Sequence, residues 1–182
     1  ISVVVAVEPV ADELIEKIAD RIKLIKVGDG RRSCDMGPLV TQQHRDKVAS
    51  YIDIAKADGA DVVVDGREVN PDGDAAGYWL GPTLIDKVPT SSNVYREEIF
   101  GPVLSIVRVQ SYQEGLDLIN SGAFGNGTAI FTNDGGAARR FQNEVEVGMV
   151  GINVPIPVPV AYFSFGGWKH SLFGDSRAHG EE

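Results

Sequence analysis

The sequence predicts an α/β fold with a mostly parallel sheet and helices on both of its faces. Short apolar runs rich in β-branched residues recur along the chain and are typical of strands. Amphipathic segments with apolar residues at helical spacing separate several of these runs. A crossover through a helix returns the chain to the end of the sheet at which the previous strand began. This alternation therefore favours parallel strands whose helices cover both faces.

The individual elements follow from local patterns. Strands are expected at residues 2–7, 61–65, 83–85, 103–107, 128–131 and 149–152. The first is continuously apolar, which predicts burial on both faces, and the one at 149–152 is expected to be the last. An amphipathic helix is expected over residues 11–26. Three further helices are indicated by Thr41 as an N-cap with Gly59 as a terminator, by the capping box of Ser111 and Glu114, and by Asp134 as an N-cap.

Length and charge limit the possible functions. A chain of 182 residues that is 43% apolar can bury one sizeable core, so we expect a single domain or a large piece of one. The 17 Lys and Arg residues against 26 Asp and Glu residues give a net charge of −9, which opposes binding to nucleic acid or to an anionic membrane. No apolar run approaches the length of a membrane span.

The start of the chain predicts a fragment of a longer protein, and its cysteine content predicts the compartment. The sequence begins at Ile1, inside a β-branched run, so we expect a fragment of a longer protein. Its single cysteine allows no internal disulfide, and no targeting segment opens the chain. These features favour a reducing compartment, the cytoplasm or, in a eukaryote, the mitochondrial matrix.

The first candidate site is the stretch Glu97-Glu98-Ile99-Phe100-Gly101-Pro102-Val103, which leads into an apolar strand. Ligands of α/β sheets bind in loops at strand ends. The carboxylate of Glu98 can accept hydrogen bonds from a vicinal diol, and the ring of Phe100 offers an apolar wall to a flat heterocycle. The alternative is that Glu97 and Glu98 form a solvated pair while Phe100 belongs to the core.

The second candidate site runs from Asn153 to Lys169 and contains Phe163, Phe165 and a Gly-Gly pair. Two aromatic residues separated by one position, next to a glycine hinge, are suited to line an entrance through which an elongated substrate passes. The alternative is a hydrophobic loop that docks on the core.

Other residues carry weaker signals. Cys34 lies in a polar loop with no sequence-adjacent base, so an inert thiol is expected. The three histidines show no metal-ligand spacing, and we expect no metal site. The segment Gly125-Asn126-Gly127 leads into a strand and not a helix, so we interpret it as a turn and not as a phosphate cradle.

Taken in order, several motifs resemble those of the aldehyde dehydrogenase superfamily over almost the whole chain. They are GPTLI at 81–85, EEIFGPV at 97–103, GNGTAIFT at 125–132 and FGGWK at 165–169. Within the superfamily, GINVPIPVP at 151–159 and FSFGG at 163–167 most resemble the CoA-acylating methylmalonate-semialdehyde dehydrogenases. Ser164 stands where most members of the superfamily have proline, which supports the subgroup.

The resemblance implies that residues 1–182 form a catalytic domain, truncated at both ends, of an enzyme that uses NAD and, as co-substrate, CoA. No catalytic residue is then present, because the nucleophilic cysteine is expected just upstream of Ile1. By motif match, Glu98 would hold the nicotinamide ribose and Phe100 would pack near the nicotinamide ring. Phe163 and Phe165 would border the aldehyde tunnel, with Asn153 as a weaker match near it. The intact enzyme is expected to be a homo-oligomer.

Two other functions remain open at this point. One is an aldehyde dehydrogenase that releases a free acid by hydrolysis. The other, from a different class, is a noncatalytic module that binds a nucleotide or a partner.

Overall fold

The structure is a computed structural model that describes residues 2–73, 76–155 and 157–173. The chain divides into two compact units, Ile1–Gln110 and Ser111–Glu182, which we describe one at a time. None of the helices in the described ranges is both long enough and apolar enough to cross a membrane.

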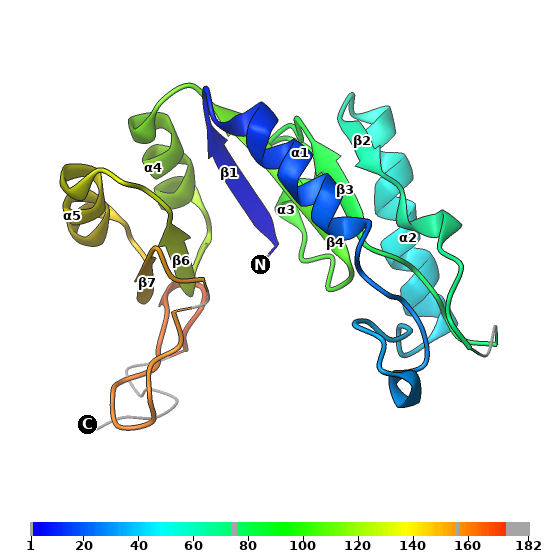
Figure 1. The fold of residues 1–182 in the computed structure, drawn as a ribbon. Coiled ribbons are helices and arrows are strands. Elements are labelled where there is room, and N and C mark those ends of the chain that lie inside the picture. The colour runs from blue at the N-terminus through cyan, green and yellow to red at the C-terminus, as the bar shows by residue number, and fades with distance from the viewer. Residues whose placement is uncertain (1, 74–75, 156, 174–182) are drawn as a thin grey trace. The chain divides into compact units, whose positions relative to one another are not determined.

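The first unit is built around a four-stranded sheet (Figure 1). Its elements are β1 (Val3–Val7), α1 (Ala11–Ile22), the 3₁₀ helix η1 (Gly30–Arg32), α2 (Gln42–Ala57), β2 (Asp61–Val64), the 3₁₀ helix η2 (Gly66–Glu68), β3 (Thr83–Asp86), α3 (Asn93–Arg96) and β4 (Val103–Val109). The strand order is β1-β4-β3-β2, with β1 and β3 parallel to β4 and β2 antiparallel to β3. The predicted α/β class with a mostly parallel sheet is therefore confirmed.

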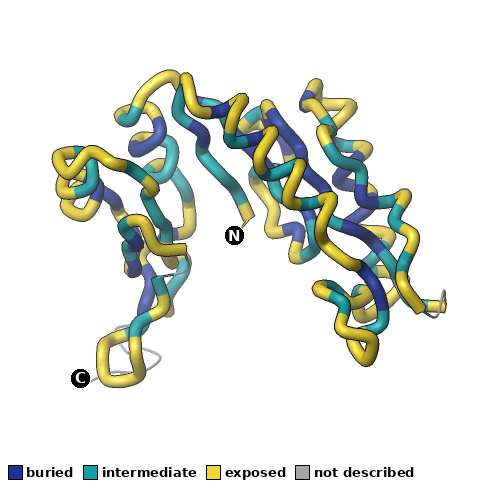
Figure 2. Tube along the Cα trace, in the orientation of Figure 1, coloured by how far each residue is buried: buried dark blue, intermediate teal, exposed yellow. Residues whose placement is uncertain are grey.

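One face of this sheet is covered by α1. Alternate side chains of a strand point to the same face, and Ala6, Leu84 and Ile106 form a cluster with Ala11 and Ile15 of the helix. Figure 2 shows the result as a buried centre in β3 and β4 beneath the exposed outer surface of α1. The helix is shorter than the predicted range 11–26, because the chain after Ile22 tightens into turn-type hydrogen bonds.

The first strand differs from its prediction. Of β1, only Ala6 is buried, and the other residues are half-buried. The prediction of burial on both faces is wrong for the described chain because β1 is an outer strand of the sheet, with β4 on one side only.

Helix α2 begins and ends as predicted. The Thr41 hydroxyl accepts a hydrogen bond from the His44 amide at 3.1 Å, and Gly59 adopts a φ of +85° directly after the helix. The predicted apolar stripe of Val48, Ile52 and Ala55 is buried. Tyr51, which was not predicted, joins it.

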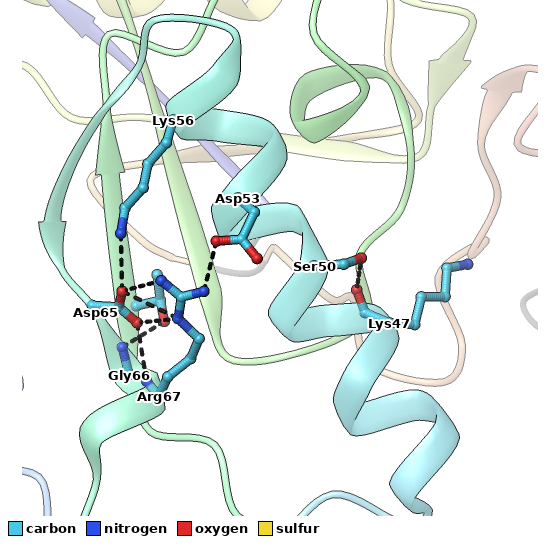
Figure 3. Close-up of polar contacts among 8 residues, drawn as sticks. Lys47, Ser50, Asp53, Lys56, Asp65, Gly66 and Arg67 are labelled. Carbon is cyan, nitrogen blue, oxygen red and sulfur yellow. Dashed lines mark hydrogen bonds and ion pairs between the residues drawn. The ribbon is translucent and has the colours of Figure 1, made fainter.

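Polar contacts join α2 to the turn after β2 (Figure 3). The Arg67 guanidinium bridges Asp65 and Asp53, at 2.6 and 2.7 Å, and Lys56 reaches Asp65 at 3.4 Å. The same turn needs glycine at position 66, since a Cβ there would lie 1.9 Å from the Gly81 carbonyl oxygen. These contacts tie the C-terminal half of α2 to the sheet.

In the described part of the second unit, the chain forms two helices and four short strands. They are α4 (Tyr112–Ser121), β5 (Phe124–Gly125), β6 (Gly127–Ile130), α5 (Gly135–Glu144), β7 (Met149–Ile152) and β8 (Trp168–Lys169). Strands β6 and β7 are parallel, and β5 pairs with β8 in the antiparallel sense. A core of Leu116, Phe141, Val145 and Val147 holds the helices together.

The predicted helix starts in this unit are confirmed. The Ser111 hydroxyl accepts a hydrogen bond from the Glu114 amide, and the Asp134 carboxylate accepts from two amides at the start of α5. The pairing of β5 with β8, two residues each, was not predicted. It places Gly125 in a strand and not in the predicted turn, and it adds a strand after β7, which was predicted to be the last. Strands of two residues carry no periodicity that a sequence pattern could reveal.

Candidate functional site

The first candidate site is a loop between α3 and β4. Upstream, the hydroxyl of Ser92 accepts a hydrogen bond from the Val94 amide and so caps α3. Within the loop, Ile99 is buried, whereas Glu98 and Phe100 are exposed on either side of it. Phe100 is 77% exposed, so the alternative that it belongs to the core is wrong. An aromatic ring displayed to this extent is available to a ligand.

The backbone of Phe100 lies in a sparsely populated conformation. Its φ of +57° falls in the left-handed region, which costs a bulky residue about 1–3 kcal/mol and persists only when surrounding contacts enforce it. One such contact is made by His44, whose Nε2 lies 2.9 Å from the Phe100 carbonyl oxygen. Another is close packing of Gly101, where a Cβ would lie 2.5 Å from a methyl group of Val48.

The two adjacent glutamates have different surroundings. The Tyr51 hydroxyl donates a hydrogen bond of 2.5 Å to the Glu97 carboxylate, and this bond is the main cause that raises the pKa of Tyr51 to about 12. Glu98 is exposed and makes no hydrogen bond or ion pair with another residue in the described part of the chain. The alternative of a solvated acidic pair therefore fails for Glu97, whose carboxylate is bonded to Tyr51 of α2, whereas the exposure of Glu98 is compatible with it.

A hollow of about 300 Å³ lies beside this loop. Its lining includes Glu97, Glu98 and Phe100 together with Ser2 and Val3 at the start of β1. The hollow thus combines two adjacent carboxylates, an exposed aromatic ring and the beginning of the first strand on one side of the first unit.

The residues of the second candidate site all lie in the second unit. Asn153 follows β7 with a φ of +56°, and its amide group makes paired hydrogen bonds of 2.9 and 3.0 Å with the backbone of Thr132. Phe163 is 57% exposed and its ring centroid lies 4.6 Å from that of Tyr162, while Phe165 is half-buried. Ile156 of the motif at 151–159 lies outside the described residues.

The alternative of a hydrophobic loop docked on the core describes only part of this segment. Gly166 and Gly167 are buried, and a Cβ on Gly148 would lie 1.9 Å from the Gly166 carbonyl oxygen. The two glycines therefore fasten the segment to its own unit, while Phe163 projects into solvent.

Sequence reasoning missed Tyr51 and His44. They lie 46 and 56 positions from the loop residues that they contact, and neither belongs to a recognisable motif. The available signal was their spacing, because His44, Val48 and Tyr51 fall on one face of a helix. In the described residues, no three His, Cys, Asp or Glu side chains gather as a metal site would require.

Comparisons with known proteins give a consistent result. The family model described as "Aldehyde dehydrogenase family" matches residues 1–182. The chain is 56% identical over 185 residues to the malonate-semialdehyde dehydrogenase of Pseudomonas aeruginosa, and 43% identical over 184 residues to malonate-semialdehyde dehydrogenase 2 of Geobacillus kaustophilus. These matches cover 100% and 98% of the chain but only 37% of each relative.

Solved structures are similar over the same range. The crystal structure of methylmalonate-semialdehyde dehydrogenase from Oceanimonas doudoroffii matches with a TM-score of 0.95 at 52% identity, over 99% of this chain and 37% of that one. A proposed methylmalonate-semialdehyde dehydrogenase from Sinorhizobium meliloti 1021, complexed with NAD, matches with a TM-score of 0.94 at 46% identity and the same coverage. Betaine aldehyde dehydrogenase from Staphylococcus aureus in complex with NAD+ matches with a TM-score of 0.90 at 35% identity, over 100% of this chain and 36% of that one.

The chain therefore spans little more than a third of the length of these relatives. The match of the family model to all 182 residues, together with identities well above 30%, gives its membership: the chain belongs to the aldehyde dehydrogenase family.

Proposed function

We propose that this chain is part of an NAD-dependent, CoA-acylating malonate- or methylmalonate-semialdehyde dehydrogenase. The observation that carries the proposal is the joint display of Glu98 and Phe100 on one loop, held in a costly conformation beside a hollow. The names of the relatives at 43–56% identity support the choice of substrate class.

The residues at the hollow suit a nicotinamide cofactor. An exposed carboxylate that no other described residue binds is free to accept hydrogen bonds from two ribose hydroxyls, the role we assign to Glu98. An exposed ring provides an apolar face for a flat heterocycle, the role we assign to Phe100. NAD+, when bound, supplies the hydride acceptor.

The nucleophile is proposed to be a cysteine that precedes Ile1 in the intact enzyme. Ser2 and Val3 line the same hollow as Glu98 and Phe100, so a thiolate a few residues before them would be close to the cofactor. Attack on the aldehyde creates a negatively charged tetrahedral centre, which needs oriented donors in a dry site. The residues of this chain would position cofactor and substrate, and the acyl group would leave as a thioester of CoA after decarboxylation.

In the second unit, Phe163 and Phe165 are proposed to border the aldehyde tunnel. Asn153 uses both polar atoms of its amide on Thr132, so we propose that it holds the loop in place and does not itself bind the substrate. We further propose that the intact enzyme is a homo-oligomer.

The experiment that tests the function uses the intact enzyme with NAD+ and malonate or methylmalonate semialdehyde, with and without CoA. We expect NADH formation that depends on CoA, together with acetyl-CoA or propanoyl-CoA as the product. A free acid formed at a rate indifferent to CoA would instead identify an aldehyde dehydrogenase of the hydrolytic type. Absence of NADH with a range of aldehydes would favour a noncatalytic module.

A further inference from the structure

The loop that carries Glu98 and Phe100 is held by one face of α2. His44, Val48 and Tyr51 are spaced by four and three positions, so their side chains lie on the same side of the helix. Each contacts a different point of the loop: His44 the carbonyl of Phe100, Val48 the backbone at Gly101, and Tyr51 the carboxylate of Glu97. We call these three residues the clamp.

The clamp fixes the loop on both sides of Glu98. Immediately before Glu98, the Glu97 side chain is bonded to Tyr51 at 2.5 Å. Immediately after it, Ile99 is buried, and the next carbonyl lies 2.9 Å from the His44 ring. The backbone around Glu98 therefore has little conformational freedom, although its side chain is exposed.

The helix that carries the clamp is itself well anchored. Thr41 caps its first turn, and the ion pairs of Arg67 with Asp53 and Asp65 tie its later turns to the sheet (Figure 3). Because the donor is fixed on a rigid helix, its hydrogen bond restrains the position of the loop.

The contact between Tyr51 and Glu97 is the strongest of the three. Tyr51 is only 3% exposed, so its hydroxyl would be left buried and unpaired without Glu97. A hydrogen bond to a carboxylate is roughly twice as strong as one between neutral groups. A tyrosine hydroxyl is protonated at neutral pH and is therefore a donor, and the hydrogen bond to Glu97 raises the pKa of Tyr51 further, to about 12.

We propose that Tyr51 is a positioning residue for the cofactor site, acting through Glu97, and that His44 supports it through the carbonyl of Phe100. This inference rests on the proposed cofactor role of Glu98 and Phe100. It gives Glu97 a function that differs from that of its neighbour: Glu97 binds the protein, so that Glu98 is held ready to bind the cofactor.

The test uses the intact enzyme and the variant Tyr51→Phe, which removes the hydroxyl and keeps the ring. We expect NAD binding to weaken by roughly three- to tenfold and amide hydrogen exchange of residues 97–101 to accelerate. Glu97→Ala is expected to have the same effect, and Glu97→Gln a smaller one because it keeps an acceptor for Tyr51. The matched control is Tyr78→Phe in the same unit but outside the clamp, which should leave NAD binding and loop exchange unchanged.

The double variant Tyr51→Phe/Glu97→Ala should bind NAD no more weakly than Glu97→Ala alone, because both substitutions remove the same contact. Additive effects would overturn the proposal, as would unchanged NAD binding in Tyr51→Phe. A purely structural role would lower the melting temperature without a selective change in NAD affinity or in exchange of the loop, and that result would also overturn it.

The Glu98→Gln variant separates this inference from the proposed function. If Glu98→Gln weakens NAD binding but Tyr51→Phe does not, the clamp is refuted and the cofactor role of Glu98 stands. If Tyr51→Phe weakens NAD binding but Glu98→Gln does not, the role of Glu98 is refuted, and the clamp stands as a means of positioning Phe100.

Discussion

The contact between Gly101 and α2 leads to a sharp prediction for the substitution Gly101→Ala. The added Cβ would lie 2.5 and 2.8 Å from the two methyl groups of Val48, well inside van der Waals contact. Val48 is fully buried, and a β-branched side chain in a helix has essentially one χ1 rotamer, so it cannot turn away. We expect a loss of about 1–3 kcal/mol in the free energy of unfolding, the usual cost of overpacking.

The assay is urea denaturation of the intact protein, with Gly37→Ala as the matched control. A Cβ at Gly37 would meet no atom within 4 Å, so this variant should be as stable as the parent protein. The double variant Val48→Ala/Gly101→Ala should be no less stable than Val48→Ala alone, because the shorter side chain removes the clash. Equal stability of Gly101→Ala and Gly37→Ala would refute the close packing of the loop on α2.

Three further predictions concern other parts of the chain. Glu98→Gln in the intact enzyme should slow hydride transfer by roughly ten- to a hundredfold through looser cofactor placement, measured as the single-turnover rate of NADH formation; an unchanged rate and NAD affinity would remove Glu98 from the site. Hydrogen bonding from Arg67 lowers the pKa of Asp65 to about 2, below its unfolded value near 3.9. The pair therefore stabilises the fold above about pH 4, and this contribution is lost as the pH falls toward 2. Asp65→Asn should cost about 1 kcal/mol at pH 7 in urea denaturation, a value reduced by solvent screening, and the deficit should shrink toward pH 2; a pH-independent deficit would contradict the ion-pair origin. Asp134→Ala should destabilise α5 by about 1 kcal/mol, seen as faster hydrogen exchange at the amides of Gly136 and Ala137, whereas unchanged exchange would argue against the cap.

Local chemistry made much of the fold predictable. The helix starts at Thr41, Ser111 and Asp134 were correct because a capping side chain and the amide that it satisfies lie within three residues of one another. The strands of the sheet were recognisable as short apolar runs, although no helix was predicted between the parallel strands β3 and β4. The limits of such reasoning appear at β1, whose half-burial depends on its place at the edge of the sheet, and at β5 and β8, whose pairing joins residues more than 40 positions apart.

The candidate site shows the same division between local and distant causes. Glu98 and Phe100 can be proposed from the sequence because their motif is contiguous, and its resemblance to a known family supplies proposed roles that composition could not. The alternation of the loop explains why both are exposed: burial of Ile99 leaves the residues on either side of it turned outward. What the motif could not reveal is why two carboxylates stand side by side, because the partner of the first one is a tyrosine 46 positions earlier. A hydroxyl buried in α2 distinguishes Glu97 from Glu98, and only the folded chain brings it there. An acidic pair that reads as one feature in the sequence is therefore two in the structure: both carboxylates line the hollow, but only that of Glu97 is bonded to Tyr51 of the helix.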